Sequence, residues 1–115
     1  MRNYRELVAW QVAFQLARRV YQVTEGFPKA EAFGLTSQMR RSAVSVVSNI
    51  AEGAGRSTKR DFAQFVTVAR GALNELETQY LLAKELGFCD GDSEIDTLVE
   101  RHYGLVNGLR NSLND

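Results

Sequence analysis

The chain of 115 residues is long enough for one domain with a hydrophobic core and too short for two. Its composition, 44% hydrophobic and 24% charged, excludes a disordered chain, and no apolar run is long enough to cross a bilayer or to serve as a signal peptide. The net charge of zero conceals a division: residues 1–60 carry ten basic and four acidic residues (+6), whereas residues 61–115 carry four and ten (−6). This asymmetry favours an anionic partner or self-association.

Residues 4–25 predict a first helix with apolar side chains on two neighbouring stripes. One stripe consists of Leu7, Trp10, Phe14, Ala17 and Tyr21, and the other of Ala9, Ala13, Leu16, Val20 and Val23. A helix that is apolar over so wide an arc usually contacts more than its own bundle. Gly26 and Pro28 end this helix, and the chain up to Gly34 is predicted to form a loop.

The second predicted helix begins at Thr36 or Ser37, either of which can cap it, and ends at Glu52 or Gly53. Its apolar stripe consists of Met39, Ala43, Val46, Val47, Ile50 and Ala54. The spacing of four and three residues that places these side chains on one face is typical of an amphipathic helix.

Two further helices follow, each preceded by the spacing of a capping box. Thr58 and Asp61 begin the longer one, which Gly87 closes, and Ser93 and Asp96 begin the last. No strand pattern competes with these helices. Because the connections are short, we predict an all-α fold, an antiparallel up-down-up-down four-helix bundle that forms a single domain over residues 1–115.

The second helix also carries polar side chains at alternating spacings of four and three, which places them on one seam of the helix. This polar seam consists of Gln38, Ser42, Ser45, Asn49 and Glu52. In a structural interpretation the seam hydrogen-bonds with neighbouring helices and sets their register. In a functional interpretation it lines a groove or the channel of an oligomer.

Seven basic residues surround this seam or lie near the end of the first helix. They are Arg18, Arg19, Arg40, Arg41, Arg56, Lys59 and Arg60. In an antiparallel pair of helices the four arginines of this set that lie at residues 18–19 and 40–41 would form one cluster. Such a cluster suits phosphate, because the planar guanidinium donates two hydrogen bonds at once and bound cations release counterions.

Two considerations limit a nucleic-acid interpretation of these cations. The alternative is that they pair with Glu75, Glu77 or Glu85 within or between subunits. The sequence also lacks the interleaved aromatic residues on which single-strand binders stack bases. Any recognition of nucleic acid would therefore depend on its backbone and shape.

The sequence offers little for catalysis, a metal or a cofactor. It contains no phosphate-binding glycine motif, nucleophile elbow or zinc-ligand spacing. Glu75 and Glu77 are two residues apart and face different sides of a helix, so they cannot share a metal ion, and His102 falls on an apolar stripe that predicts a core or interface position. Cys89 is the only cysteine, and a free thiol fits a reducing compartment. We expect a cytoplasmic, non-enzymatic protein without metal or cofactor.

Four stretches of the sequence carry a resemblance to a known family. They are VAWQVAF, VYQVTEGFP, FGLTSQMRRSAVSVVSNIAEGAGR and ELETQYLLAKELGF. Through them the chain resembles the small four-helix-bundle proteins encoded in intervening sequences of bacterial 23S ribosomal RNA genes, strongly over residues 4–88 and more weakly beyond. Val47 stands where we expect proline in this family, and Ala72 where we expect serine.

The resemblance implies a bundle that assembles into a ring, commonly a homopentamer, in a family without established enzymatic activity. The fold is also similar to that of the accessory protein of diversity-generating retroelements, a basic pentameric barrel that associates with a reverse transcriptase and with nucleic acid. A protomer with a +6 half and a −6 half is compatible with such a ring, because head-to-tail contacts close when the rotation permits.

These observations together predict a non-catalytic homo-oligomer, a pentamer by resemblance, that binds RNA or DNA electrostatically. The resemblance also implies a protein partner such as a reverse transcriptase. The alternative is a structural or protein-binding assembly that has no nucleic-acid role.

Overall fold

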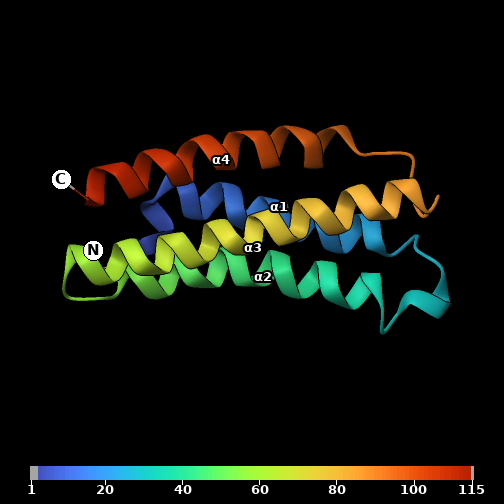
Figure 1. The fold of residues 1–115 in the computed structure, drawn as a ribbon, viewed down its shortest axis with the longest axis horizontal. Coiled ribbons are helices and arrows are strands. Elements are labelled where there is room, and N and C mark those ends of the chain that lie inside the picture. The colour runs from blue at the N-terminus through green and yellow to red at the C-terminus, as the bar shows by residue number, and fades with distance from the viewer. Residues whose placement is uncertain (1–2, 115) are drawn as a thin grey trace.

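The protein forms four long helices that pack side by side around a common core (Figure 1). The computed structural model describes residues 3–114, and this part of the chain contains no strand. The helices are α1 (Val8–Thr24), α2 (Leu35–Ala54), α3 (Lys59–Glu85) and α4 (Ser93–Leu113), with short 3₁₀ turns η1 (Tyr4–Glu6) and η2 (Lys29–Glu31) before α1 and α2. The predicted all-α four-helix fold is therefore confirmed.

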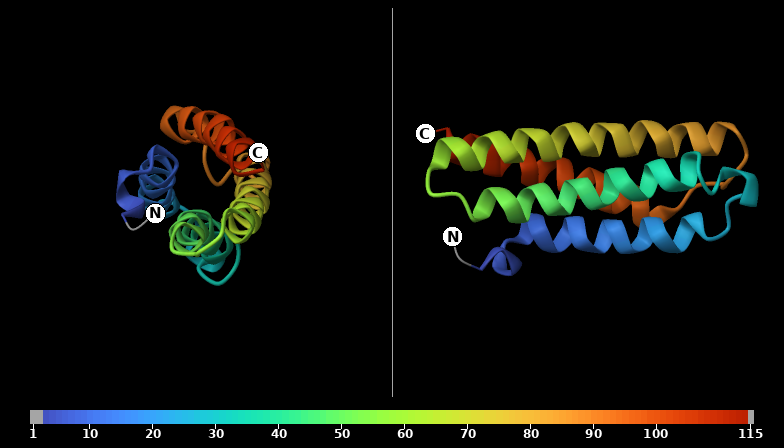
Figure 2. Two further views of the ribbon diagram at one scale, coloured as in Figure 1. Left: turned by 90° about the vertical axis from the view of Figure 1, so that its left-hand side faces the viewer. Right: turned by 90° about the horizontal axis from the view of Figure 1, so that it is seen from below.

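Each helix packs against two others, so the four helices form a closed cycle in cross-section (Figure 2). The pairs in contact are α1 with α2, α2 with α3, α3 with α4, and α4 with α1. Figure 1 shows that the chain reverses direction at each connection, as the predicted up-down-up-down topology requires. The basic part of the sequence, residues 1–60, thereby supplies α1, α2 and the first two residues of α3, and the acidic part supplies the rest of α3 and α4.

The predicted first helix is interrupted near its start. Leu7 is extended (φ −72°, ψ 125°) and separates η1 from α1. Since this break turns η1 back toward α1, the Tyr4 ring packs edge-on against the Trp10 ring, with 5.4 Å between the ring centroids. The Gln11 side chain, which donates to the carbonyl of Arg5 at 2.8 Å, holds the turn in place.

The capping residues predicted for α2 and α4 are wrong: the N-cap of α2 is Gly34, two or three positions before the predicted Thr36 or Ser37, and that of α4 is one position before the predicted Ser93. The helix α2 begins at Leu35, and its first N–H donates to Oε1 of Glu31 at 3.0 Å, so a glutamate four residues back replaces the expected Thr36 or Ser37. The cap of α4 is Asp92, whose carboxylate accepts from the N–H of Ile95 at 3.0 Å.

The predicted ends of α3 agree with the structure. Thr58 caps its start by accepting from the N–H of Asp61 at 3.1 Å. Gly87 has a left-handed φ of 80°, and hydrogen bonds from Gly87 N to Lys84 O and from Phe88 N to Ala83 O close the helix. This is the Schellman arrangement, in which glycine adopts positive φ without a steric penalty.

The core consists of two clusters of buried apolar side chains. The larger one draws on all four helices and includes Met39, Leu73 and Leu76, which are fully buried. The smaller one contains Ile50, Val66, Ala69 and Val106, with Trp10 half-buried beside it. Burial of these side chains is the main term that stabilises the fold.

Close contact between α2 and α3 depends on Gly53. A Cβ atom added at this position would lie 2.7 Å from Cβ of Phe65 and 2.9 Å from Cδ1 of Phe62. Because a Cβ atom cannot rotate away, the two helices would have to move apart. Gly53 therefore sets the distance between α2 and α3, which together hold the groove described below.

Replacing Gly53 with alanine is expected to lower the free energy of unfolding by about 1–3 kcal/mol, although alanine is the better helix former. Gly71→Ala in α3 is the matched control, since a Cβ there meets nothing within 4 Å. That variant should gain up to about 1 kcal/mol from helix propensity alone. Urea unfolding measures both, and a gain in both variants would contradict the close contact at Gly53.

Candidate functional site

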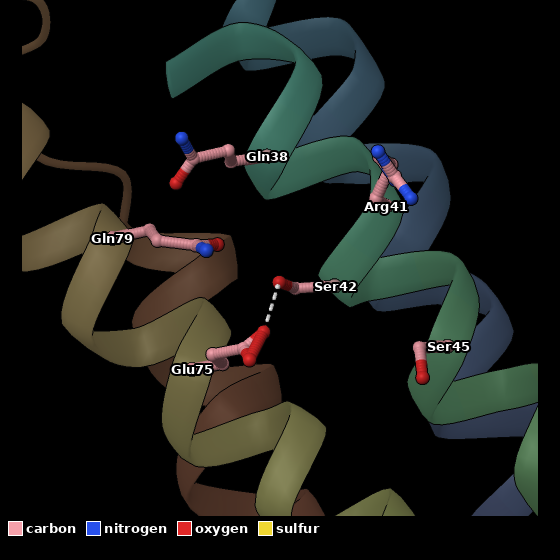
Figure 3. Close-up of a pocket in the computed structure, with 6 residues that line it drawn as sticks. All are labelled: Gln38, Arg41, Ser42, Ser45, Glu75 and Gln79. Atoms are coloured by element: carbon pink, nitrogen blue, oxygen red, sulfur yellow. Dashed lines mark hydrogen bonds between the residues drawn. The ribbon is translucent and has the colours of Figure 1, made fainter. Parts of the chain in front are cut away.

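An open polar groove of about 600 Å³ lies between α2 and α3 (Figure 3). It is lined by Gln38, Arg41, Ser42 and Ser45 of α2 and by Glu75 and Gln79 of α3. Ser42, the most buried of these residues, donates from its hydroxyl to Oε2 of Glu75 at 3.3 Å. Figure 3 shows the side chains of Ser42, Glu75 and Gln79 directed toward the space between the two helices.

The groove accounts for the first part of the polar seam only. Asn49, further along α2, donates to the backbone carbonyl of Ser45 at 2.8 Å and to its hydroxyl at 3.1 Å, so its amide is used within its own helix. Glu52 is exposed and pairs with Arg56 one turn later, at 2.8 Å. Within residues 3–114, Ser42 is the one seam residue whose side chain hydrogen-bonds to another helix.

The structure directs Arg19 away from the predicted arginine cluster. Its guanidinium donates from Nε to the Asp92 carboxylate at 3.0 Å, and Nη2 contacts the same carboxylate. This hydrogen bond holds the pKa of Asp92 below its usual range. The backbone N–H of Asp92 donates to the Tyr80 hydroxyl at 2.7 Å, so Arg19 belongs to a network that joins α1, α3 and the start of α4.

Arg40 and Arg56 are also engaged within the protomer. Arg40 donates from Nε to the Thr24 hydroxyl at 2.9 Å and from Nη2 to Glu25 at 3.3 Å, which fastens the start of α2 to the end of α1. Arg56, in the connection between α2 and α3, pairs with Glu52 in the last turn of α2. Of the seven basic residues predicted to bind nucleic acid, Arg19, Arg40 and Arg56 therefore form ion pairs with acidic residues of their own chain.

The other four basic residues are exposed, and within residues 3–114 no acidic side chain lies within 4.0 Å of their charged nitrogens. They are Arg18, Arg41, Lys59 and Arg60. The predicted pairing with Glu75, Glu77 or Glu85 does not occur within the described protomer. We refer to these four residues as the free cations.

An aromatic stripe runs along the outer face of α1. Trp10 and Phe14 are stacked with 5.0 Å between their ring centroids, and Phe14 and Tyr21 are 52% and 43% exposed. In the first of the two predicted stripes Phe14 and Tyr21 are exposed, Leu7 and Trp10 are half-buried and Ala17 is buried, whereas the second stripe faces the core. The expectation that α1 is apolar over more surface than its bundle needs is consistent with this exposure.

His102 lies in the core of the bundle and not in a reactive site. It is fully buried, and its Nε2–H donates to the carbonyl of Ala9 at 3.0 Å. Burial lowers the pKa of His102 to about 4, because the charged form would lose its hydration. The described residues contain no group of three or more His, Cys, Asp or Glu placed to hold a metal ion.

Sequence reasoning missed the α3 wall of the groove. Glu75 and Gln79 are one helical turn apart on the face of α3 that meets the polar seam, and the spacing of four residues was the available signal. Glu77 lies on another side of the helix, where its carboxylate accepts from the Tyr103 hydroxyl at 3.2 Å. The prediction that Glu75 and Glu77 face different sides is thus confirmed.

The fold and these surfaces define an all-α helical-bundle protein with a polar groove, free cations and an exposed aromatic stripe. Within residues 3–114, no helix combines the length and the apolar character needed to span a membrane.

The chain belongs to the 23S rRNA-intervening sequence protein family, whose profile matches residues 5–111. It is similar in fold to the crystal structure of a protein of unknown function from the S23 ribosomal protein family of Bacteroides thetaiotaomicron. The TM-score is 0.73 at 18% identity, over 94% of this chain and 100% of that one. A search of curated protein sequences finds no match. The resemblance noted in the sequence is therefore confirmed.

Proposed function

We propose that this protein is a non-catalytic, homo-oligomeric helical-bundle scaffold that binds nucleic acid electrostatically. The observation that carries the proposal is the set of free cations, which have no acidic partner in the described protomer. Arginine donates two parallel hydrogen bonds to a phosphate, and each cation that neutralises a phosphate releases counterions. We expect this role in the cytoplasm, where the single thiol of Cys89 stays reduced.

Two features support self-association. The basic residues are concentrated in the part of the chain that forms α1 and α2 and the acidic ones in the part that forms α3 and α4, so different sides of two copies are complementary in charge. The aromatic stripe on α1 offers apolar surface that association would remove from water. Five is the number of subunits that the family resemblance implies.

The proposal is tested by the binding of ribosomal RNA fragments and duplex DNA over a salt series, with the oligomer mass measured by light scattering at each salt concentration. On duplex DNA the logarithm of the binding constant should fall with the logarithm of the salt concentration, with a slope of about −0.9 per neutralised phosphate. The double variants Arg18→Gln with Arg41→Gln, and Lys59→Gln with Arg60→Gln, should each weaken binding and reduce that slope by about one to two.

Arg101→Gln is the matched control, because Arg101 is exposed on α4, among the acidic residues of the second half. It should leave both the affinity and the slope unchanged. Binding that does not respond to salt would overturn the electrostatic proposal. An oligomer that dissociates as salt rises, and with which nucleic acid does not compete, would favour the alternative of a structural or protein-binding assembly.

A further inference from the structure

The α3 wall of the groove presents hydrogen-bond acceptors that the described residues do not fully satisfy. The Glu75 carboxylate receives one side-chain hydrogen bond, from Ser42, although it has sites for about four. One turn further along α3, the Oε1 atom of Gln79 is buried and has no donor among the described residues. This wall therefore fits a ligand that brings adjacent N–H donors.

The α2 wall contributes a positive charge to the groove. Arg41 lines the same groove as Glu75, yet the two charged groups are not within 4.0 Å of each other. Arg41 and Glu75 therefore line one groove without forming an ion pair with each other. A ligand that fills the groove must offer donors to α3 and negative charge to α2.

We propose that the groove binds an unpaired guanine nucleotide of a single-stranded RNA, with the Watson–Crick edge of the base on Glu75 and Gln79 and the adjoining phosphate on Arg41. Guanine is the base whose Watson–Crick edge carries two adjacent donors, N1–H and the N2 amino group, which match the two oxygens of a carboxylate. Unpaired RNA bases are commonly recognised through this edge. The inference rests on the proposed nucleic-acid function and specifies which base the scaffold selects.

The size and polarity of the groove agree with this occupant. Its volume of about 600 Å³ accommodates a nucleotide, and its lining side chains are all polar or charged. Ser42 is 4% exposed and donates to Glu75, so it holds the carboxylate in position for an incoming base. Arg41 is one of the free cations and also lines the groove, so the same residue can bind the phosphate that adjoins the bound base.

The test compares three fluorescently labelled single-stranded RNAs of one length and uridine background, with a central guanosine, inosine or adenosine. Inosine lacks the N2 amino group, and adenosine lacks both donors. We expect the full-length protein to bind the guanosine RNA about tenfold more tightly than the other two. In Glu75→Gln, which replaces one carboxylate oxygen by an amide nitrogen, the preference should fall to less than about twofold.

Glu85→Gln is the matched control, because it removes one negative charge from an exposed position of α3 outside the groove. Both variants should gain the same nonspecific affinity, and Glu85→Gln should keep the guanosine preference. A preference that survives in Glu75→Gln would overturn the assignment. Equal, salt-dependent binding of all three RNAs would overturn the guanine site while leaving the nucleic-acid proposal standing. A failure to bind any RNA or DNA would overturn both.

Discussion

Replacing Leu76 with alanine is expected to lower the free energy of unfolding by about 2–5 kcal/mol. Leu76 has no exposed surface and lies in the larger core cluster, where side chains of all four helices meet. Truncation removes apolar burial and leaves a cavity that the surrounding helices fill only in part. Urea unfolding measures the loss, and the slope with denaturant should stay unchanged if the native fold persists.

The control for this substitution is Leu82→Ala on the same helix. Leu82 is 47% exposed in the protomer, so its truncation should change the free energy of unfolding by less than about 1 kcal/mol. Both substitutions make the same chemical change in α3, and they differ in the face of the helix. Equal losses in the two variants would contradict the orientation of α3, with Leu76 in the core and Leu82 on the surface.

The buried face of a helix with one apolar stripe could be predicted from the sequence, whereas the buried face of α1, which has two stripes, could not. In α2 the predicted stripe is buried as expected, with Met39 and Ile50 fully buried and Val47 half-buried. In α1 both stripes satisfy the helical period, and periodicity alone cannot rank them. Contacts with α2 and α4 decide that Leu16 faces the core and Phe14 faces outward.

Of the two walls of the groove, the residues on α2 could be predicted from the sequence and those on α3 could not. The spacing of the polar seam placed Ser42 and Ser45 on one face of α2, and the structure brings both into the groove. Its other wall depends on which face of α3 meets α2. A pattern of period 3.6 does not specify the relative rotation of two helices, and the structure shows the face of α3 that carries Phe62 and Phe65 packed closely against Gly53 of α2.

Whether a basic residue is paired with an acid also depends on how the helices pack, because the partner can be distant in the sequence. Arg18 and Arg19 are adjacent in the sequence, yet Arg19 pairs with Asp92, which is 73 residues away, while Arg18 stays free. Neighbouring residues of a helix point about 100° apart, so adjacency in sequence does not imply a shared environment. The division between held and free cations, on which the proposed function depends, therefore becomes visible only in the folded chain.

Lowering the pH from 8 to 5 is expected to reduce the free energy of unfolding by about 2 kcal/mol through His102 alone. The Nε2–H of His102 donates to Ala9, and Nδ1 is buried without a partner among the described residues, so the folded protein holds the neutral imidazole. Burial lowers its pKa to about 4, below the value of about 6.5 in the unfolded chain. The unfolded state therefore binds a proton first, and the stability present above about pH 6.5 is lost as the pH falls toward 4.

The variant His102→Gln separates this contribution from that of the carboxylates. Glutamine can still donate to the carbonyl of Ala9, but it does not titrate, so the variant should lose less stability than the wild type over this pH range. Asp92, whose pKa is also lowered, is present in both proteins and cancels in the comparison. Urea unfolding at pH 8, 6.5 and 5 gives the difference between the two proteins. Parallel pH profiles would show that His102 accepts a proton in the folded state as readily as in the unfolded one, and would contradict its burial as a neutral donor in the core.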